Sequence, residues 1–484
     1  MTRLPTAGVL ALSRRLGAAA RLTLSALGVL AVATAAAAAL PPPLQQVLHN
    51  QRIDADSISL WVQRIGDTEP LIAHHADTPR NAASVTKLLT SLAALEQLGP
   101  AHRWQTSVYA LRDPAAPERA QLLIVGGGDP LLRVEDLWRL AQRVRQAGIT
   151  TQLGPLQRDS SYFSIDHPDP GAFNNQPLRV YNQPPHPLLI NYNAVWFRIA
   201  NTAGGGVSII ADPPLAGLEL RQRVRSVNRA CGGFQRGVAV NVDATGVVHL
   251  DGEYPAACRD DFALVRRVVD PEDYLRDAWG LVWAQWDGDV APAGADPVLE
   301  RRDWQRVAEH HSQTLGELLA PINKSSSNVI SRQVKMTLAA EAGLYSAAEG
   351  RAQILSTLRG IGVDVDGVVF DSAAGLSRTQ RITARQVASV LAHGQAHVHA
   401  PEFLASLSLL GVDGTLRERL VDHPLAARAR LKTGRLNAVS ALAGLVRTHD
   451  DETYLLVLIV NAEEAHRGPG EVLQDAVLDW LHAR

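Results

Sequence analysis

The stretch from Asn81 to Thr90 opens a strongly patterned helix and places a hydroxyl and an amine at its start. Apolar side chains recur at helical spacing until Gly99 and Pro100 stop the pattern; they are Val85, Leu88, Leu89, Leu92 and Leu95. The spacing predicts a buried helix. Residues three apart share one helix face, so the Ser84 hydroxyl and the Lys87 amine can meet there. A nucleophile beside a base is the arrangement that covalent catalysis needs.

Lysine is rare in this chain, which gives Lys87 weight. Only four of the 47 basic residues are lysine, and these are Lys87, Lys324, Lys335 and Lys432. Arginine stays protonated in proteins, whereas a buried lysine can lose its proton and act as a base. We therefore interpret Lys87 as a catalytic base; the alternative is a lysine on the solvated face of the helix.

Length and composition indicate an ordinary globular protein. The chain has 484 residues, enough for two to four domains, with 46% apolar and 20% charged residues. Its formal net charge is −2, without the basic excess typical of nucleic-acid-binding proteins. We expect no nucleic-acid partner.

Residues 1–39 read as an export signal. Four arginines precede the apolar run of residues 22–40, which ends in small residues and is followed by three prolines. This predicts a signal peptide cleaved near Ala37 to Ala39, and hence a periplasmic protein. The alternative is an uncleaved anchor helix, because the run is close to the length that spans a membrane.

The two cysteines, Cys231 and Cys258, lie in one Gly-rich segment. In an exported protein an even number of neighbouring cysteines favours a disulfide. Neither cysteine has metal-ligand spacing. The pairs His74-His75 and His310-His311 are not part of HExxH or a similar metal-binding motif. We expect no metal and no cofactor.

Periodicity divides the mature chain into two kinds of structure. Alternating runs around Gly66 predict a hairpin, and from about residue 105 short strand-like runs are separated by Gly, Pro and Asn turns. Helical patterns return at 271–286, around 314–319 and at 329–338. The simplest interpretation is an α/β (α+β) domain of residues 40–104 and 276–484, interrupted by a mostly β insertion of residues 105–275.

Two further motifs lie in the C-terminal third. Ser326 and Asn328 have Ser-x-Asn spacing on a predicted turn before a helix. Lys432, Thr433 and Gly434 lie on a predicted strand, followed by two apolar strands and a closing helix. Each motif alone is usually a polar turn or a strand end. The order Ser-x-x-Lys, Ser-x-Asn, Lys-Thr-Gly is hard to produce by chance.

These motifs and their separations resemble the type-4, class C (low-molecular-mass) penicillin-binding proteins, which are D-alanyl-D-alanine carboxypeptidases/endopeptidases. Other similar segments extend over the mature chain: GGGDPLL at 126–132, DSSYF at 159–163, INYN at 190–193, DSAAGLSR at 371–378 and GVDGTLRER at 411–419. The resemblance implies a β-lactamase-like catalytic domain split by two small inserted domains. The second would be nested at about 195–265, where both cysteines fall. It also implies peptidoglycan peptides as substrates and β-lactam antibiotics as covalent ligands.

The chemistry of the first two motifs predicts the acylation step. Ser84 attacks the carbonyl of the D-Ala-D-Ala bond, and Lys87 takes its proton. The resemblance implies that Ser326 relays the proton to the leaving amine and that Asn328 orients Lys87 and the substrate amide.

The third motif is expected to hold the substrate. The positive potential of Lys432 keeps Lys87 deprotonated and attracts the terminal carboxylate, which Thr433 can hydrogen-bond beside Gly434. The oxyanion is expected between the backbone N–H groups of Ser84 and Arg435.

The chain departs from the family pattern at three places. Arg435 stands where a hydroxyl residue is common; it should share a strand face with Thr433 and pair with the carboxylate, or else turn to solvent. Ser327 stands where Asp is frequent. Relatives that grip a diaminopimelate side chain offer an aromatic and an acid after DSSYF, and here Phe173 has no carboxylate after it up to Tyr181. Arg378 is the other expected substrate contact.

Two alternatives remain. One is a β-lactamase of the same fold, which would need a group that activates water against the acyl-enzyme; no dedicated Glu is evident. The other is a non-catalytic cell-wall binding protein. The sequence leaves open whether the protein prefers carboxypeptidase or endopeptidase activity. It also leaves open whether the protein forms a homodimer or makes a peripheral contact with the membrane.

Overall fold

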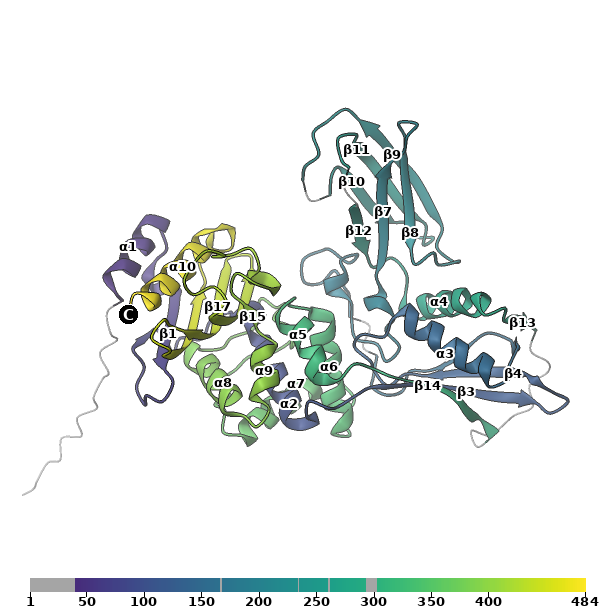
Figure 1. Ribbon diagram of the computed structural model, residues 1–484, viewed down its shortest axis with the longest axis horizontal. Coiled ribbons are helices and arrows are strands. Elements are labelled where there is room, and N and C mark those ends of the chain that lie inside the picture. The colour runs from purple at the N-terminus through teal and green to yellow at the C-terminus, as the bar shows by residue number, and fades with distance from the viewer. Residues whose placement is uncertain (1–39, 166–167, 234, 260–261, 293–302) are drawn as a thin grey trace, which may run out of the picture. The chain divides into compact units, whose positions relative to one another are not determined.

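The computed structural model describes residues 40–165, 168–233, 235–259, 262–292 and 303–484 (Figure 1). The predicted signal peptide lies outside these residues. Within the described part of the chain, no helix is long and apolar enough to cross a membrane.

The main domain is organised around one six-stranded antiparallel sheet. In spatial order its strands are β15 (Ser408–Leu409), β16 (Ala429–Leu436), β17 (Val439–Arg447), β18 (Thr453–Val460), β1 (Ile58–Arg64) and β2 (Ile72–His74). Alternate residues enter two different cores: Ala441 and Val457 face one, and Leu442 and Leu458 face the other. The sheet is therefore buried on both faces.

Helices cover both faces of this sheet. The first core receives apolar side chains from α2 (Lys87–Leu98), α5 (Leu315–Asn323), α6 (Asn328–Glu341), α7 (Ala347–Gly360), α8 (Ala384–Ala396) and α9 (Ala400–Ala405). The second core receives them from α1 (Pro42–Gln51) and α10 (Pro469–His482). The predicted Ser84 helix is thus the buried helix α2, and the closing helix is α10.

The insertion has a second six-stranded sheet and its own core. Five strands follow the order β13 (Asp289–Ala291), β5 (Thr151–Leu153), β4 (Ala116–Val125), β3 (Gln105–Asp113) and β14 (Gln305–His311), and β6 (Gln157–Asp159) pairs with β4. Two helices, α3 (Val134–Gln146) and α4 (Pro271–Gln285), supply apolar residues to this core.

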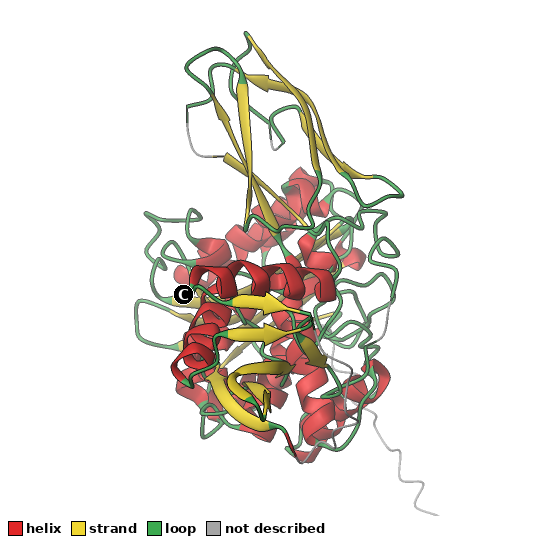
Figure 2. Cartoon of the chain, turned by 90° about the vertical axis from the view of Figure 1, so that its right-hand side faces the viewer, coloured by secondary structure: helices red, strands yellow, loops and turns green. Residues whose placement is uncertain are grey.

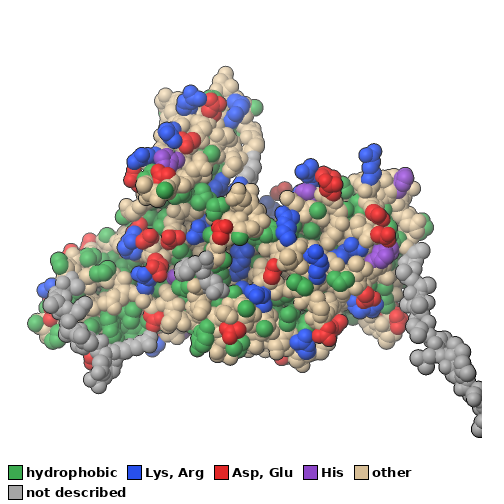
Figure 3. All heavy atoms as spheres, turned by 180° about the vertical axis from the view of Figure 1, so that it is seen from behind, with side chains coloured by type: hydrophobic (Ala, Val, Ile, Leu, Met, Phe, Trp, Pro, Cys, Tyr) green, Lys and Arg blue, Asp and Glu red, His purple; other side chains and the backbone are tan. Residues whose placement is uncertain are grey.

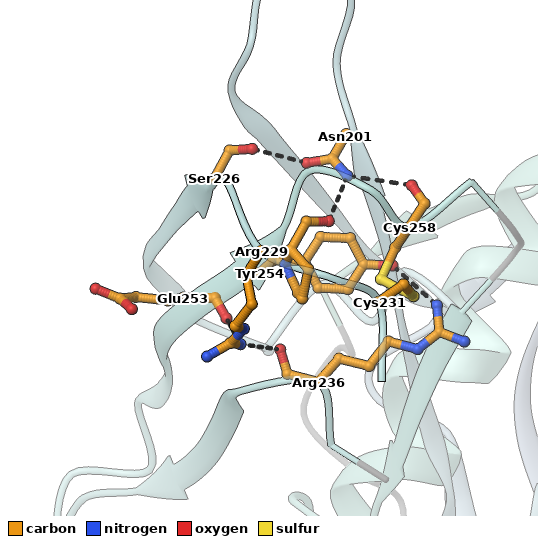
Figure 4. The surroundings of a disulfide bond; sticks show 9 residues. Asn201, Ser226, Arg229, Cys231, Arg236, Glu253, Tyr254 and Cys258 are labelled. Atoms are coloured by element: carbon orange, nitrogen blue, oxygen red, sulfur yellow. Dashed lines mark hydrogen bonds between the residues drawn. A yellow bond between two sulfur atoms is a disulfide. The ribbon is translucent and has the colours of Figure 1, made fainter. Parts of the chain in front are cut away.

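A nested subdomain interrupts the insertion and is built from strands and loops (Figure 2). One three-stranded sheet has the order β12 (Phe262–Arg266), β7 (Val195–Asn201), β8 (Val207–Asp212), and the other β10 (Val238–Val242), β11 (Val248–Pro255), β9 (Leu220–Val227). Cys231 and Cys258 form a disulfide here (Figure 4). Beside it the Asn201 side-chain amide donates to the carbonyls of Pro255 and Cys258.

The insertion ends later than the predicted residue 275. Helix α4 packs in the core of the insertion through Trp279 and Trp283, and β14 pairs with β3. The chain returns to the main domain only at α5, which begins at Leu315. The prediction failed here because a helical period shows that a helix has an apolar face but not which core that face meets.

Candidate active site

Ser84 lies in a short 3-10 turn, η2 (Ala83–Thr86), directly before α2. The residue before it, Ala83, has φ 45°, a left-handed conformation that is costly for a residue with a side chain. The side chain of Asn81 accepts a hydrogen bond from Ala83 N at 2.9 Å and stabilises this turn. The strained turn therefore presents Ser84 at the end of a buried helix.

Lys87 is fully buried one turn later. Its Nζ lies 2.9 Å from Ser84 Oγ and 2.7 Å from Asn328 Oδ1, and it also donates to the carbonyl of Ala374. Burial lowers the Lys87 pKa well below its usual value, and the charges of Lys432 and Arg332 lower it further. A neutral amine has two N–H donors and one lone pair. With Asn328 and Ala374 taking the N–H groups, the lone pair is left for the Ser84 hydroxyl.

The Ser-Ser-Asn motif forms the turn into α6. Ser326 has φ 57°, and Ser327 caps the helix by accepting a hydrogen bond from Ile330 N at 3.3 Å. Asp is also a good N-cap residue, which explains how serine can replace it at the middle position. Asn328 then starts the helix, with its side chain on Lys87.

Lys432, on β16, is the second fully buried lysine of the site. Its Nζ donates to Ser326 Oγ at 3.0 Å and to the carbonyl of Thr433 at 2.8 Å. Burial lowers its pKa to about 7. The motif residues thus form two hydrogen-bonded groups. Lys87 contacts Ser84 and Asn328, and Lys432 contacts Ser326.

Two glycines allow loops to approach the serine closely. A Cβ at Gly434 would lie 2.4 Å from the Ala82 carbonyl and 3.2 Å from Ser84 N. A Cβ at Gly375 would lie 2.7 Å from Ser84 Cα, and Gly375 also has φ +78°. Strand β16 and the DSAAGLSR segment therefore both pack against the turn of the nucleophile.

Thr433 and Arg435 differ in their surroundings. Thr433 Oγ1 is 2.9 Å from Thr415 Oγ1, a residue of the GVDGTLRER segment. The side chain of Arg435 is 61% exposed, and its Nη1 lies 3.3 Å from Glu471 Oε1 on α10. The guanidinium thus has an acidic partner that the sequence did not reveal.

A pocket of about 280 Å³ opens between the insertion and helices α6 and α7. Phe173 lines it, and the guanidinium of Arg378 lies over the Phe173 ring at 5.2 Å. Its charged lining residues are Asp169, Arg332, Lys335, Arg351 and Asp371. We call this cavity the side-chain pocket.

The sequence analysis missed the acids and the arginines of this pocket. Asp169 follows DSSYF but lies four residues before Phe173, whereas the acid was expected after Phe173. Arg332 is one helical turn after Asn328, so it could have been found from the i, i+4 spacing. Its Nη1 donates to the Tyr181 carbonyl at 2.7 Å, and burial lowers its pKa to about 10.

Comparisons with known proteins agree with this geometry. A family model described as D-Ala-D-Ala carboxypeptidase 3 (S13) matches residues 41–481. A D-alanyl-D-alanine carboxypeptidase of Actinomadura sp. (strain R39) is 30% identical over 420 residues, which cover 82% of this chain and 75% of the relative. The D-alanyl-D-alanine carboxypeptidase DacB of Haemophilus influenzae is 22% identical over 84% of this chain and 86% of its own length.

A solved structure supports the fold. The crystal structure of penicillin binding protein 4 (dacB) from Haemophilus influenzae aligns with a TM-score of 0.75 and 22% identity, over 91% of this chain and 99% of the other. Together with the family match, this leads to one conclusion. The chain belongs to the D-Ala-D-Ala carboxypeptidase 3 (S13) family of serine peptidases.

Proposed function

We propose that the protein is an exported serine DD-peptidase that acts on peptidoglycan stem peptides through an acyl-enzyme on Ser84. The observation that carries this proposal is the set of contacts around Lys87. Two carbonyl acceptors and one hydroxyl surround a buried amine whose pKa is lowered by burial. Such an amine can remove the proton of Ser84 at neutral pH.

Acylation forms one bond and breaks one. Ser84 Oγ attacks the carbonyl carbon between the two D-Ala residues while its proton moves to Lys87 Nζ. The C–N bond then breaks, and the leaving amine receives a proton. We assign Ser326 the relay of the proton from Lys87 to that amine; its hydroxyl is held in place by the hydrogen bond that it accepts from Lys432. Water later hydrolyses the ester and regenerates Ser84.

The terminal carboxylate of the substrate would lie at the third motif. Below about pH 7 Lys432 carries a positive charge, and Thr433 offers a hydroxyl on the same strand. The backbone N–H groups of Ser84 and Arg435 are the proposed oxyanion donors.

We further propose that the side-chain pocket takes the side chain of the residue that precedes D-Ala-D-Ala. Its lining carries acids and bases together, which suits a side chain ending in both an amine and a carboxylate, such as diaminopimelate. Asp169 and Asp371 supply the acidic part of this lining, which suits the ammonium group of such a side chain. Phe173 would pack against the apolar part of that side chain.

Export and periplasmic location are part of the same proposal. Residues 1–39 carry the features of a signal peptide, and the disulfide is typical of an oxidising compartment. Basic and acidic side chains are interspersed over the face drawn in Figure 3, which gives no support for a nucleic-acid partner.

The test is covalent labelling followed by substrate turnover. Benzylpenicillin should add one equivalent of mass to the wild-type protein, on a peptide containing residues 84–87. Ser84→Ala should remain unlabelled, and Ser356→Ala, a change at an exposed serine on α7, should label like the wild type. Label on another peptide would refute the assignment.

The fate of the label and of cell-wall fragments completes the test. Rapid release of the adduct would favour the β-lactamase alternative, whereas a long-lived adduct supports the peptidase. Purified pentapeptide monomers and cross-linked dimers, followed by mass, then give the preference between removal of D-Ala and cleavage of cross-links.

A further inference from the structure

The loop of residues 173–182 has a hollow on each side. Phe173 and Asn182 line the side-chain pocket, while Asn175 and Gln176 line a second hollow of about 520 Å³. The loop is tied together, because Asn182 Nδ2 donates to the carbonyl of Gln176 at 2.9 Å. Phe173 and Asn175 are two residues apart, so their Cα atoms lie at most about 7 Å from each other, and the two hollows flank the same short loop.

The opposite wall of this hollow belongs to the nested subdomain and carries a buried arginine. Arg266, the last residue of β12, is only 5% exposed. Its Nη1 donates to the Val265 carbonyl at 2.9 Å and its Nη2 to Gln235 Oε1 at 2.8 Å. In the part of the chain that the structure describes, no carboxylate forms an ion pair with it. Buried charges in proteins are normally paired, so we expect this guanidinium to bind an anion.

A second cation and several amides share the hollow. Burial and the charge of Arg179 lower the pKa of Arg266 to about 10, which indicates that the two arginines are close. Arg179 lines the same hollow and donates from Nε to Gln176 Oε1 at 2.9 Å. Asn175 and Asn241 add side-chain amides. Guanidinium and amide donors that converge on one space match a carboxylate.

We propose that this hollow is a second substrate subsite, which binds the free carboxylate of the acidic residue that precedes the side chain held in the side-chain pocket. This inference rests on the proposed function, because it assumes a stem peptide lying across the loop of residues 173–182. Arg266 and Arg179 contact the carboxylate, and the loop separates it from the neighbouring side chain. The subsite would make recognition depend on a charge two residues away from the bond that is cleaved.

The experiment compares two peptides that differ in one charge. They are L-Ala-γ-D-Glu-meso-diaminopimelyl-D-Ala-D-Ala and the same peptide with the free glutamate carboxylate converted to an amide. The wild type should hydrolyse the free acid with a kcat/KM about tenfold higher or more, the size of one charge-assisted hydrogen bond. Arg266→Gln and Arg179→Gln should lose this preference and be acylated by benzylpenicillin at the wild-type rate.

Controls separate this inference from the proposed function. Arg221→Gln, at an exposed arginine of the same subdomain, should keep the wild-type preference. Calorimetry on the Ser84→Ala protein measures binding of both peptides without turnover. Equal affinities there, or a preference retained in Arg266→Gln and Arg179→Gln, would overturn the subsite. Failure of benzylpenicillin to label Ser84 would instead count against the proposed function.

Discussion

The main domain and the nested subdomain are stabilised in different ways. In β17 every residue from Val439 to Val446 is buried, whereas in β9 only Val224 is. Strands β9 and β11 of the nested subdomain are joined on their exposed side by ion pairs such as Arg223 with Asp251, which contribute little in water. A disulfide closes the subdomain covalently. The large apolar core of the main domain can offset the cost of its two buried lysines, Lys87 and Lys432.

The largest effect is expected from removing a buried lysine of the main domain. Lys87→Ala removes the proposed base, so acylation by benzylpenicillin should slow by about 10²- to 10⁴-fold, the usual contribution of general base catalysis. Stopped-flow or mass measurement of the adduct checks this, with thermal unfolding as a control of folding. Acylation at an undiminished rate would show that another group takes the proton.

The disulfide should matter for stability and not for chemistry. Cys231→Ser with Cys258→Ser opens a loop with a sequence separation of 27 residues, which should lower the free energy of unfolding of the nested subdomain by about 3 kcal/mol. Denaturant unfolding followed in that subdomain measures the loss. The acylation rate of the folded variant should match the wild type, because both cysteines lie outside the main domain that carries the three motifs. A large fall in that rate would mean that the two regions are coupled.

Arg435 lies at the rim of the site and should have an intermediate effect. If Arg435 leaves Glu471 to hold the substrate carboxylate, Arg435→Thr should lower kcat/KM on peptides with a free D-Ala-D-Ala end. The loss should correspond to about 1 to 3 kcal/mol. Cross-linked dimers should be affected less. Arg467→Thr, at another exposed arginine paired with a glutamate, is the matched control. Unaltered rates on both substrates would leave the carboxylate to Thr433 and Lys432.

The pH dependence of acylation should change gradually around the pKa of Lys432. The pKa of Lys432 is lowered to about 7, so the residue is charged below that pH and neutral above it. The second-order rate of acylation by benzylpenicillin, which carries a carboxylate, should therefore fall as the pH rises above about 7, by up to about tenfold per pH unit. Lys432→Met should react slowly and lack this alkaline limb. A wild-type rate that keeps rising to pH 9 would contradict the assigned role of the charge.

Much of the site could be predicted because each motif is local. Ser84 and Lys87 are one turn apart, and Ser326 and Asn328 share a turn, so spacing alone relates their side chains. Asp169 and Arg332 could not be paired in this way. Asp169 comes from the insertion and Arg332 from α6, and only the folded chain brings them to one pocket. The predicted end of the insertion at residue 275 was wrong for the same reason, because the sequence of α4 does not show which of the two cores the helix joins.

The pairing of β1 with β18 has a consequence for how the chain is made. Residues Ile58–Arg64 pair with residues Tyr454–Val460, which come about 400 residues later in the sequence. During synthesis, β1 emerges long before this partner. Its unpaired apolar edge must stay soluble until the last strand arrives, a situation that slows folding and invites aggregation. Strands β3 and β4 of the insertion are neighbours in sequence, so they can pair while β1 still lacks its partner β18.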